Sequence, residues 1–325
     1  MIYWKSYGFQ GKSLGFLDVS KRLLIIGGTG FIGKSLAREA LLLGFSVVVL
    51  SLRCPSKKEK IQCVSYLQAD INNFIDLQNN LVAADFEYVV NLSGYVDHAG
   101  FFTGGKAIID THFIGLQNIT QILNWKKIER FVQVGSSDEY GGNEAPQHEN
   151  MREMPISPYS LAKVANTHFL QMLHRTDNFQ VVILRLFLVY GPGQGCGRFL
   201  PQIVEGCFSE KEFKTSLGEQ VRDFCYIDDI TDGILKALKC DNVNGEIINL
   251  ASGNPISIRT VIEKVQTYIG KGSPKFGKIA YRTGENMSLY ADISKAELLL
   301  GWRPKTAIES GIKKIVDHYR LHNLK

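Results

Sequence analysis

The chain has 325 residues, a mass of 36.4 kDa, 45% hydrophobic residues and 21% charged residues. These values suit a globular protein with a large core, and they exclude intrinsically disordered, collagen-like and disulfide-scaffold proteins. The 37 Lys and Arg against 32 Asp and Glu leave a formal net charge of +5, which at this length does not indicate a nucleic-acid partner. The six cysteines form no CxxC pair and have no zinc-type spacing with histidine, so we expect a reducing compartment and no metal.

No apolar run approaches the roughly 18 residues that span a bilayer. Residues 1–20 mix aromatic, basic and glycine residues and lack the apolar core of a signal peptide. We therefore expect residues 1–20 to be a short N-terminal extension, and we expect a cytoplasmic protein without a membrane partner.

From residue 21 onward, short apolar runs alternate with segments of helical periodicity. The runs predict strands at 23–26, 45–52, 64–67, 88–92, 131–134, 181–186 and 246–250. Helices are predicted at 31–43, 106–125 and 157–174. Such alternation is typical of βαβ units, so the predicted fold class is α/β, with a Rossmann doubly wound parallel sheet.

The pattern changes after Tyr190, where a glycine-rich turn is followed by shorter elements. The predicted dinucleotide-binding domain covers residues 21–190. Residues 191–325 mainly form a smaller, partly interleaved substrate lobe, and segments near 222–252 return to the first domain.

A glycine-rich turn directly follows the first predicted strand and opens the first helix. It consists of Gly27, Gly28, Thr29, Gly30, Phe31, Ile32 and Gly33. Glycine allows the tight turn and the close approach of the backbone to a pyrophosphate, and the helix N-terminus favours its charge. The strand before and the helix after the motif favour dinucleotide binding over a purely structural turn.

The end of the second predicted strand carries no carboxylate. An NAD-preferring site would place an acidic residue there for the ribose hydroxyls, whereas this chain has Leu50, Ser51, Leu52 and Arg53. The planar guanidinium of Arg53 can hold a 2′-phosphate, which favours NADP(H), with NAD(H) as the alternative. The alternative interpretation is that the Arg53 side chain points into solvent and binds no phosphate.

Tyr159 and Lys163 are four residues apart at the start of a predicted helix, so they share one helical face. A nearby ammonium is expected to lower the pKa of the phenol, which could then exchange a proton with a substrate oxygen. Ser136 and Ser137 follow a strand whose carboxyl end should face the same site. One of them could hydrogen-bond the reacting carbonyl, and the other is expected in a turn.

The chain resembles the extended short-chain dehydrogenase/reductase family, in its nucleotide-sugar-modifying branch, from about residue 21 to 307. The matching motifs are the glycine turn, Asp70-Ile71, Ser136 with Tyr140-Gly141, Tyr159 with Lys163, Arg185 with Tyr190-Gly191-Pro192, Arg222-Asp223-Phe224 with Asp228-Asp229, and Ala291-Asp292 with Leu300-Gly301-Trp302 and Pro304. The resemblance implies that Ser136, rather than Ser137, is catalytic together with Tyr159 and Lys163.

The same resemblance implies the binding residues. Asp70 and Ile71 would flank the adenine, and Leu92, Ser93 and Gly94 would line the cofactor. Substrate contacts would come from Ser137, Arg198, Arg222 and Arg282. Paired arginines suit a diphosphate, because guanidinium binds phosphate in a bidentate manner.

Within this branch, residues 135–141 look most like those of GDP-4-keto-6-deoxymannose reductases and similar 4-ketosugar reductases. This implies NADPH-dependent reduction at C4 of a nucleotide-activated 4-keto-6-deoxysugar, in deoxysugar and polysaccharide biosynthesis, with Tyr159 as proton donor. The alternative is an NAD-dependent 4-epimerase or 4,6-dehydratase, for which Asp138 and Glu139 could supply acid and base groups. A reductase of a non-sugar carbonyl and a non-catalytic NADP-binding regulator remain further alternatives.

The sequence departs from the family pattern at two positions, with His112 and Leu188 in place of asparagines. His112 is either a substitute polar group or a core histidine, and His98 either reaches the sugar or lies in a surface loop. By resemblance we also expect a homodimer formed through helices 106–125 and 157–174.

Overall fold

The computed structural model describes residues 21–323 except 82–83, 210 and 282–283, so the predicted extension 1–20 and Arg282 lie outside the described residues. Seven strands form one parallel sheet in the order β10-β6-β5-β4-β1-β2-β3. They are β1 (Arg22–Ile26), β2 (Ser46–Ser51), β3 (Ser65–Gln68), β4 (Tyr88–Asn91), β5 (Arg130–Ser136), β6 (Val181–Leu186) and β10 (Ile247–Leu250). The predicted doubly wound Rossmann sheet is confirmed.

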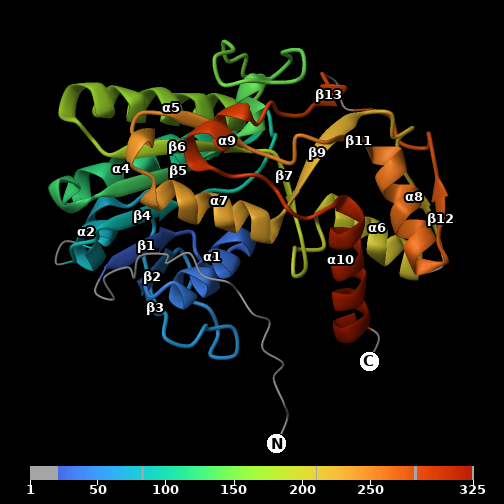
Figure 1. The fold of residues 1–325 in the computed structure, drawn as a ribbon, viewed down its shortest axis with the longest axis horizontal. Helices are drawn as coiled ribbons and strands as arrows, with labels where there is room; N and C mark the ends of the chain where they lie inside the picture. The colour runs from blue at the N-terminus through green and yellow to red at the C-terminus, as the bar shows by residue number, and fades with distance from the viewer. Residues whose placement is uncertain (1–20, 82–83, 210, 282–283, 324–325) are drawn as a thin grey trace, which may run out of the picture.

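Helices cover both faces of this sheet, at the left of Figure 1. The first face packs against α1 (Phe31–Leu42), α7 (Ile227–Lys239) and α9 (Ser294–Leu300). The second face packs against α2 (Phe74–Leu81), α4 (Gly115–Ile122) and α5 (Pro158–Asp177). Successive strand residues alternate between the two cores, which explains why the strands are mostly apolar.

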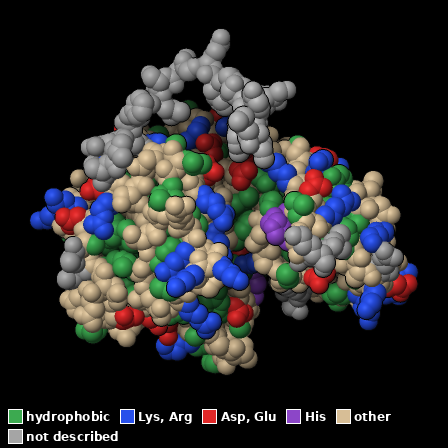
Figure 2. All heavy atoms as spheres, turned by 90° about the horizontal axis from the view of Figure 1, so that it is seen from below, with side chains coloured by type: hydrophobic (Ala, Val, Ile, Leu, Met, Phe, Trp, Pro, Cys, Tyr) green, Lys and Arg blue, Asp and Glu red, His purple; other side chains and the backbone are tan. Residues whose placement is uncertain are grey.

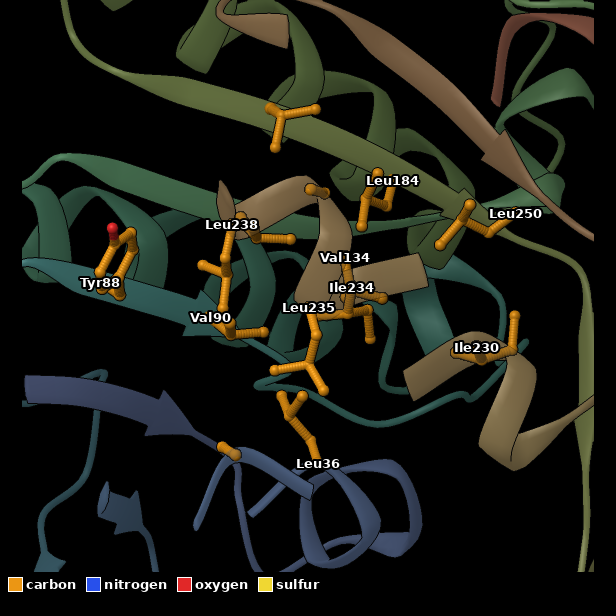
Figure 3. Packing of buried hydrophobic residues seen from close by; sticks show 14 of the residues in the cluster. Leu36, Tyr88, Val90, Val134, Leu184, Ile230, Ile234, Leu235, Leu238 and Leu250 are labelled. Atoms are coloured by element: carbon orange, nitrogen blue, oxygen red, sulfur yellow. The ribbon is translucent and has the colours of Figure 1, made fainter. Parts of the chain in front are cut away.

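Figure 3 shows the core on the first face, where Val90, Val134 and Leu184 from the sheet meet Ile234 and Leu238 of α7. These side chains are buried. Burial of this kind is the main favourable contribution to folding. It holds the strands in one register and so fixes where their carboxyl ends meet.

The smaller lobe, at the right of Figure 1, is built on the long connections after β6. Its sheet contains β7 (Leu188–Tyr190), β9 (Val221–Tyr226), β11 (Pro255–Ser257) and β13 (Ser288–Leu289), and β8 (Glu212–Lys214) pairs with β12 (Ser273–Lys275). Three helices complete its core, namely α6 (Phe199–Phe208), α8 (Ile258–Ile269) and α10 (Ile308–Asn323).

Two segments differ from the sequence-based expectation. The single helix predicted over 106–125 consists of α3 (Gly105–Ile109), a π-helical turn (Asp110–Ile114) and α4, and it is followed by a short 3-10 turn (Trp125–Lys127). Of the segment 222–252, α7 and β10 return to the large sheet, whereas β9 belongs to the small one. In the described part of the chain, no helix combines the length and apolar character that a membrane crossing needs.

Candidate functional site

The glycine turn occupies the carboxyl end of β1, next to the loop after β4. Gly27 has φ +76°, and a Cβ there would lie 2.9 Å from the carbonyl oxygen of Leu92. A Cβ on Gly33 would lie 2.4 Å from Cα of Gly28. The start of α1 can therefore pack closely against the turn after β1 because residue 33 is a glycine. The free N–H groups at the start of α1 therefore face the point where strand order reverses, which suits a pyrophosphate.

The end of β2 presents hydroxyl groups instead of a carboxylate. The Thr29 hydroxyl donates to the Ser51 hydroxyl at 3.1 Å, and the Ser51 residue is only 6% exposed. Arg53, two residues further on, is exposed to solvent. Its predicted contact with a 2′-phosphate remains a prediction.

The adjoining strand ends carry the other residues expected around a dinucleotide. The Asp70 carboxylate accepts from the backbone N–H of Asn72 at 2.9 Å, and Ile71 is buried beneath α4. The side chain of Asn91, at the end of β4, accepts from the Ser93 hydroxyl at 2.6 Å and so shapes the loop of Leu92, Ser93 and Gly94. The structure thus brings the predicted cofactor residues to one edge of the sheet.

Tyr159 and Lys163 project from the first turns of α5 toward β5. The helix begins sharply because the Ser157 side chain accepts from the Ser160 N–H at 3.1 Å and proline occupies the first helical position. The buried Lys163 ammonium donates to the carbonyl of Val134 at 2.9 Å and lies 5.8 Å from the Tyr159 ring centroid. Ser136 ends the same strand and interacts with the Tyr159 hydroxyl. The predicted trio is therefore brought together.

The expected lowering of the Tyr159 pKa is wrong. Burial and the Asp138 carboxylate raise the pKa of the phenol, while the hydroxyl of Ser136 and the charge of Arg198 oppose them. Burial also lowers the pKa of Lys163 to about 8, so the ammonium form of this lysine loses its proton more easily than that of an exposed lysine. A cationic nicotinamide beside the phenol would favour its ionised form.

Glu139 anchors the turn that follows β5. Its carboxylate accepts from the Ser136 N–H at 2.9 Å, from the Thr167 hydroxyl at 2.8 Å and from Nε of Arg185 at 3.0 Å. A Cβ on Gly135 would lie 2.6 Å from the same carboxylate, which explains the glycine there. Glu139 is fully buried and saturated with donors, so it is a structural group and not the acid or base that the dehydratase interpretation considered.

His112 belongs to the π-helical turn and lies against Tyr159. The two ring centroids are 5.2 Å apart, and the imidazole Nε2 donates to the carbonyl of Tyr95 at 2.9 Å. Burial, followed by the charge of Lys163, lowers the pKa of His112 to about 3, so the ring stays neutral. A Cβ on Gly94 would lie 2.1 Å from the His112 ring, and glycine there makes room for an imidazole.

The residues expected to bind the substrate lie on the smaller lobe and at its junction with the larger one. Arg222 of β9 is buried, forms an ion pair with Glu285 and interacts electrostatically with Asp138. Arg198 is exposed at the start of α6, and Ser137 is buried. Figure 2 shows a hollow between the two lobes, with Lys and Arg side chains along the larger one.

Comparisons with known proteins agree with this geometry. Residues 23–251 match the model of the NAD dependent epimerase/dehydratase family. The chain belongs to this family. An uncharacterized protein of Methanocaldococcus jannaschii is 30% identical over 319 residues, covering 92% of this chain and 96% of that protein. The UDP-glucuronate 4-epimerase of Thermodesulfobacterium geofontis is 29% identical, covering 90% of this chain and 94% of the relative.

A solved structure extends the similarity. The UDP-glucuronic acid 4-epimerase of Bacillus cereus, in complex with UDP-glucuronic acid and NAD, is 25% identical with a TM-score of 0.80, covering 92% of this chain and 99% of that one. These findings favour the epimerase/dehydratase alternative over the 4-ketosugar reductase, and NAD over NADP, as the properties of the family.

A substitution that removes the negative charge of Glu139 tests its structural role. Glu139→Gln should lower the free energy of unfolding by about 3–5 kcal/mol, because it leaves the buried Arg185 without a principal partner. Urea unfolding measures the loss. Glu297→Gln removes an exposed ion pair with Arg303, 2.5 Å long, and should change stability little. Equal effects of the two substitutions would contradict the structural role.

Proposed function

We propose that this protein is an NAD-dependent 4-epimerase of a nucleoside-diphosphate sugar. The observation that carries the proposal is the meeting of Tyr159, Lys163 and Ser136 beside the dinucleotide edge of the sheet, facing Arg222 on the smaller lobe. The relatives named UDP-glucuronate 4-epimerase support the same chemistry and substrate class. The glycine turn and the β4 loop fit a dinucleotide, because a pyrophosphate can approach their backbone closely.

The residues divide the proposed reaction between them. Tyr159 takes the proton of the C4 hydroxyl and later returns it to the C4 oxygen. Ser136 donates a hydrogen bond to that oxygen, where charge develops during the reaction. Lys163, held by the carbonyl of Val134 beside the phenol, would bind the nicotinamide ribose. When bound, the nicotinamide supplies a reversible hydride acceptor. The 4-keto sugar must rotate and present its opposite face between the two hydride transfers for C4 to invert.

The second candidate is an NADPH-dependent 4-ketosugar reductase. The end of β2 favours it, because Ser51 replaces the carboxylate that would repel a 2′-phosphate and Arg53 is exposed nearby. A reductase consumes one NADPH for each product, whereas an epimerase recycles its cofactor.

Cofactor preference separates the two candidates. For the epimerase, protein denatured after purification should release NAD(H), identified by chromatography, and added NADPH should not be consumed with any nucleotide sugar. Three results would instead support the reductase. The denatured protein would release NADP(H), NADPH would be oxidised in proportion to product, and Arg53→Glu would bind NADP more weakly.

Tyr159→Phe tests the proposed chemistry directly. The substitution should lower kcat for interconversion of the C4 epimers by at least about 100-fold, because it removes the proton acceptor. Product formation is followed by NMR with UDP-glucuronate and UDP-glucose. Cofactor affinity, measured by calorimetry, should be retained. Tyr268→Phe alters a partly buried hydroxyl on α8, distant in the fold from this site, and serves as the control. Undiminished turnover in Tyr159→Phe would refute the assignment.

We further propose that α5 and the helical segment 105–122, made of α3, the π-helical turn and α4, form a homodimer contact. Leu161 and Met172 of α5 are 49% and 44% exposed, and Ile114 is 40% exposed. Exposed apolar side chains on neighbouring helices support a partner surface of this kind.

A further inference from the structure

The carboxylate of Asp138 lies beside the residues proposed to act at C4. Asp138 belongs to the 3-10 helix Ser137–Tyr140 that follows β5, and its backbone N–H donates to the hydroxyl of Ser136 at 3.2 Å. Its Oδ2 is 3.8 Å from Nε2 of His98, whose ring meets the Tyr159 ring edge-on with 5.9 Å between centroids. The carboxylate is therefore next to the space that a sugar with its C4 at the phenol would occupy.

The oxygens of this carboxylate are open to a ligand. The Asp138 side chain is 30% exposed, and within the described part of the chain its oxygens accept no hydrogen bond. The neighbouring Glu139, by contrast, is fully buried and accepts from three groups. The Asp138 carboxylate can thus accept from a sugar hydroxyl, and a hydrogen bond to a charged acceptor is stronger than one between neutral groups.

The charged side chains around the phenol disfavour a further anion at this point of the cleft. Among the charges that act on Tyr159, the carboxylate of Asp138 has the largest effect, and it raises the pKa of the phenol. The carboxylate of Glu139 acts in the same direction, and the charge of Arg198 opposes both with a smaller effect. A sugar that carried its own carboxylate close to C4 would meet the same unfavourable charges.

The cations near Asp138 are already engaged or are expected to bind the diphosphate. Arg222 acts on Asp138 from β9, and it forms an ion pair with Glu285. Lys163 is buried and donates to a backbone carbonyl. Arg198 and Arg222 are expected to bind the diphosphate, whose charge every nucleoside-diphosphate sugar brings. A hexuronate adds one more negative charge, at C6, on the side of Asp138.

We propose that Asp138 determines the specificity of the site for the C6 group of the sugar. Its carboxylate accepts a hydrogen bond from the C6 hydroxyl of a nucleoside-diphosphate hexose and repels the C6 carboxylate of a hexuronate. Because C6 is attached to the ring carbon next to C4, a sugar bound with C4 at Tyr159 brings its C6 group into this region. The inference rests on the proposed 4-epimerase function and narrows its substrate to an uncharged hexose, unlike the relatives named UDP-glucuronate 4-epimerase.

The size of the expected discrimination follows from the repulsion of two like charges. Two carboxylates about 6 Å apart, at an effective dielectric constant of about 20, disfavour binding by roughly 100-fold. The charges of His98 and Arg222 act against that of Asp138 and reduce this effect. We therefore expect the wild type to prefer UDP-glucose over UDP-glucuronate by at least about 10-fold in kcat/KM.

Substitution of Asp138 tests this proposal. For the protein supplemented with NAD, kcat/KM at C4 is measured by NMR with UDP-glucose and with UDP-glucuronate. Asp138→Asn should raise the ratio of kcat/KM for UDP-glucuronate to that for UDP-glucose by at least about 10-fold, because the amide oxygen still accepts from a hydroxyl but carries no charge. Asp138→Glu retains the charge and should retain the preference for UDP-glucose.

The control is Asp97→Asn, which removes an exposed carboxylate that accepts from the backbone N–H of Ala99 in the loop after β4, and it should leave the ratio unchanged. Thermal unfolding and NAD binding should be equal in all variants.

Two results would overturn the inference and leave the proposed function intact. One is a wild type that converts UDP-glucuronate at least as efficiently as UDP-glucose, and the other is an unchanged ratio in Asp138→Asn. Absence of C4 conversion of both UDP-sugars would contradict the epimerase. The dissociation constants of the two UDP-sugars, measured by calorimetry in the wild type and in Asp138→Asn, would then decide the inference by the same ratio, and binding of neither sugar would overturn it.

Discussion

The buried carboxylate of Glu139 is the interaction on which the site geometry depends. It joins β5 through the Ser136 N–H, α5 through the Thr167 hydroxyl and β6 through the Arg185 guanidinium. Arg185 also contacts Glu153 at 2.7 Å and stacks over the Tyr140 ring. A buried ion pair costs desolvation free energy unless hydrogen bonds compensate for it. Here Nε and Nη2 of Arg185 are paired, and the bonds to Glu139 fix both the serine and the helix that carries Tyr159.

A second buried carboxylate, Asp223, plays a similar part where the two lobes meet. It accepts from the N–H groups of Ser252 at 2.6 Å, Gly253 at 2.9 Å and Ala291 at 3.3 Å. Because Ser252 follows β10 of the large sheet and Asp223 belongs to β9 of the small one, this group ties the smaller lobe to the large sheet. Arg222, the neighbour of Asp223, is thereby held opposite Asp138.

The sequence predicted those features whose signals are local. Apolar runs located all seven strands of the main sheet to within about two residues, since strands buried on both faces are mostly apolar. The spacing of Gly27 to Gly33 and of Tyr159 with Lys163 likewise depends on single elements. The π-helical turn at Asp110–Ile114 was missed because apolar residues continue through it at helical spacing.

The rest depends on tertiary contacts. The donors to Glu139 come from residues 136, 167 and 185, and no spacing rule connects them. The direction of the Tyr159 pKa was also wrong from sequence, because it is set by burial and by Asp138 rather than by the lysine one turn away. Gly135 leaves room for the Glu139 carboxylate only in the folded structure, because the two residues are four positions apart in the sequence.

The most direct measurement is the fate of the hydrogen at C4. A UDP-sugar labelled with deuterium at C4 is converted in ordinary water, and the product is analysed by mass spectrometry and NMR. The account predicts that the epimer keeps its deuterium at C4, because the hydride leaves to a bound cofactor and returns from it. Loss of the label to solvent, or its release in free reduced cofactor, would contradict the account.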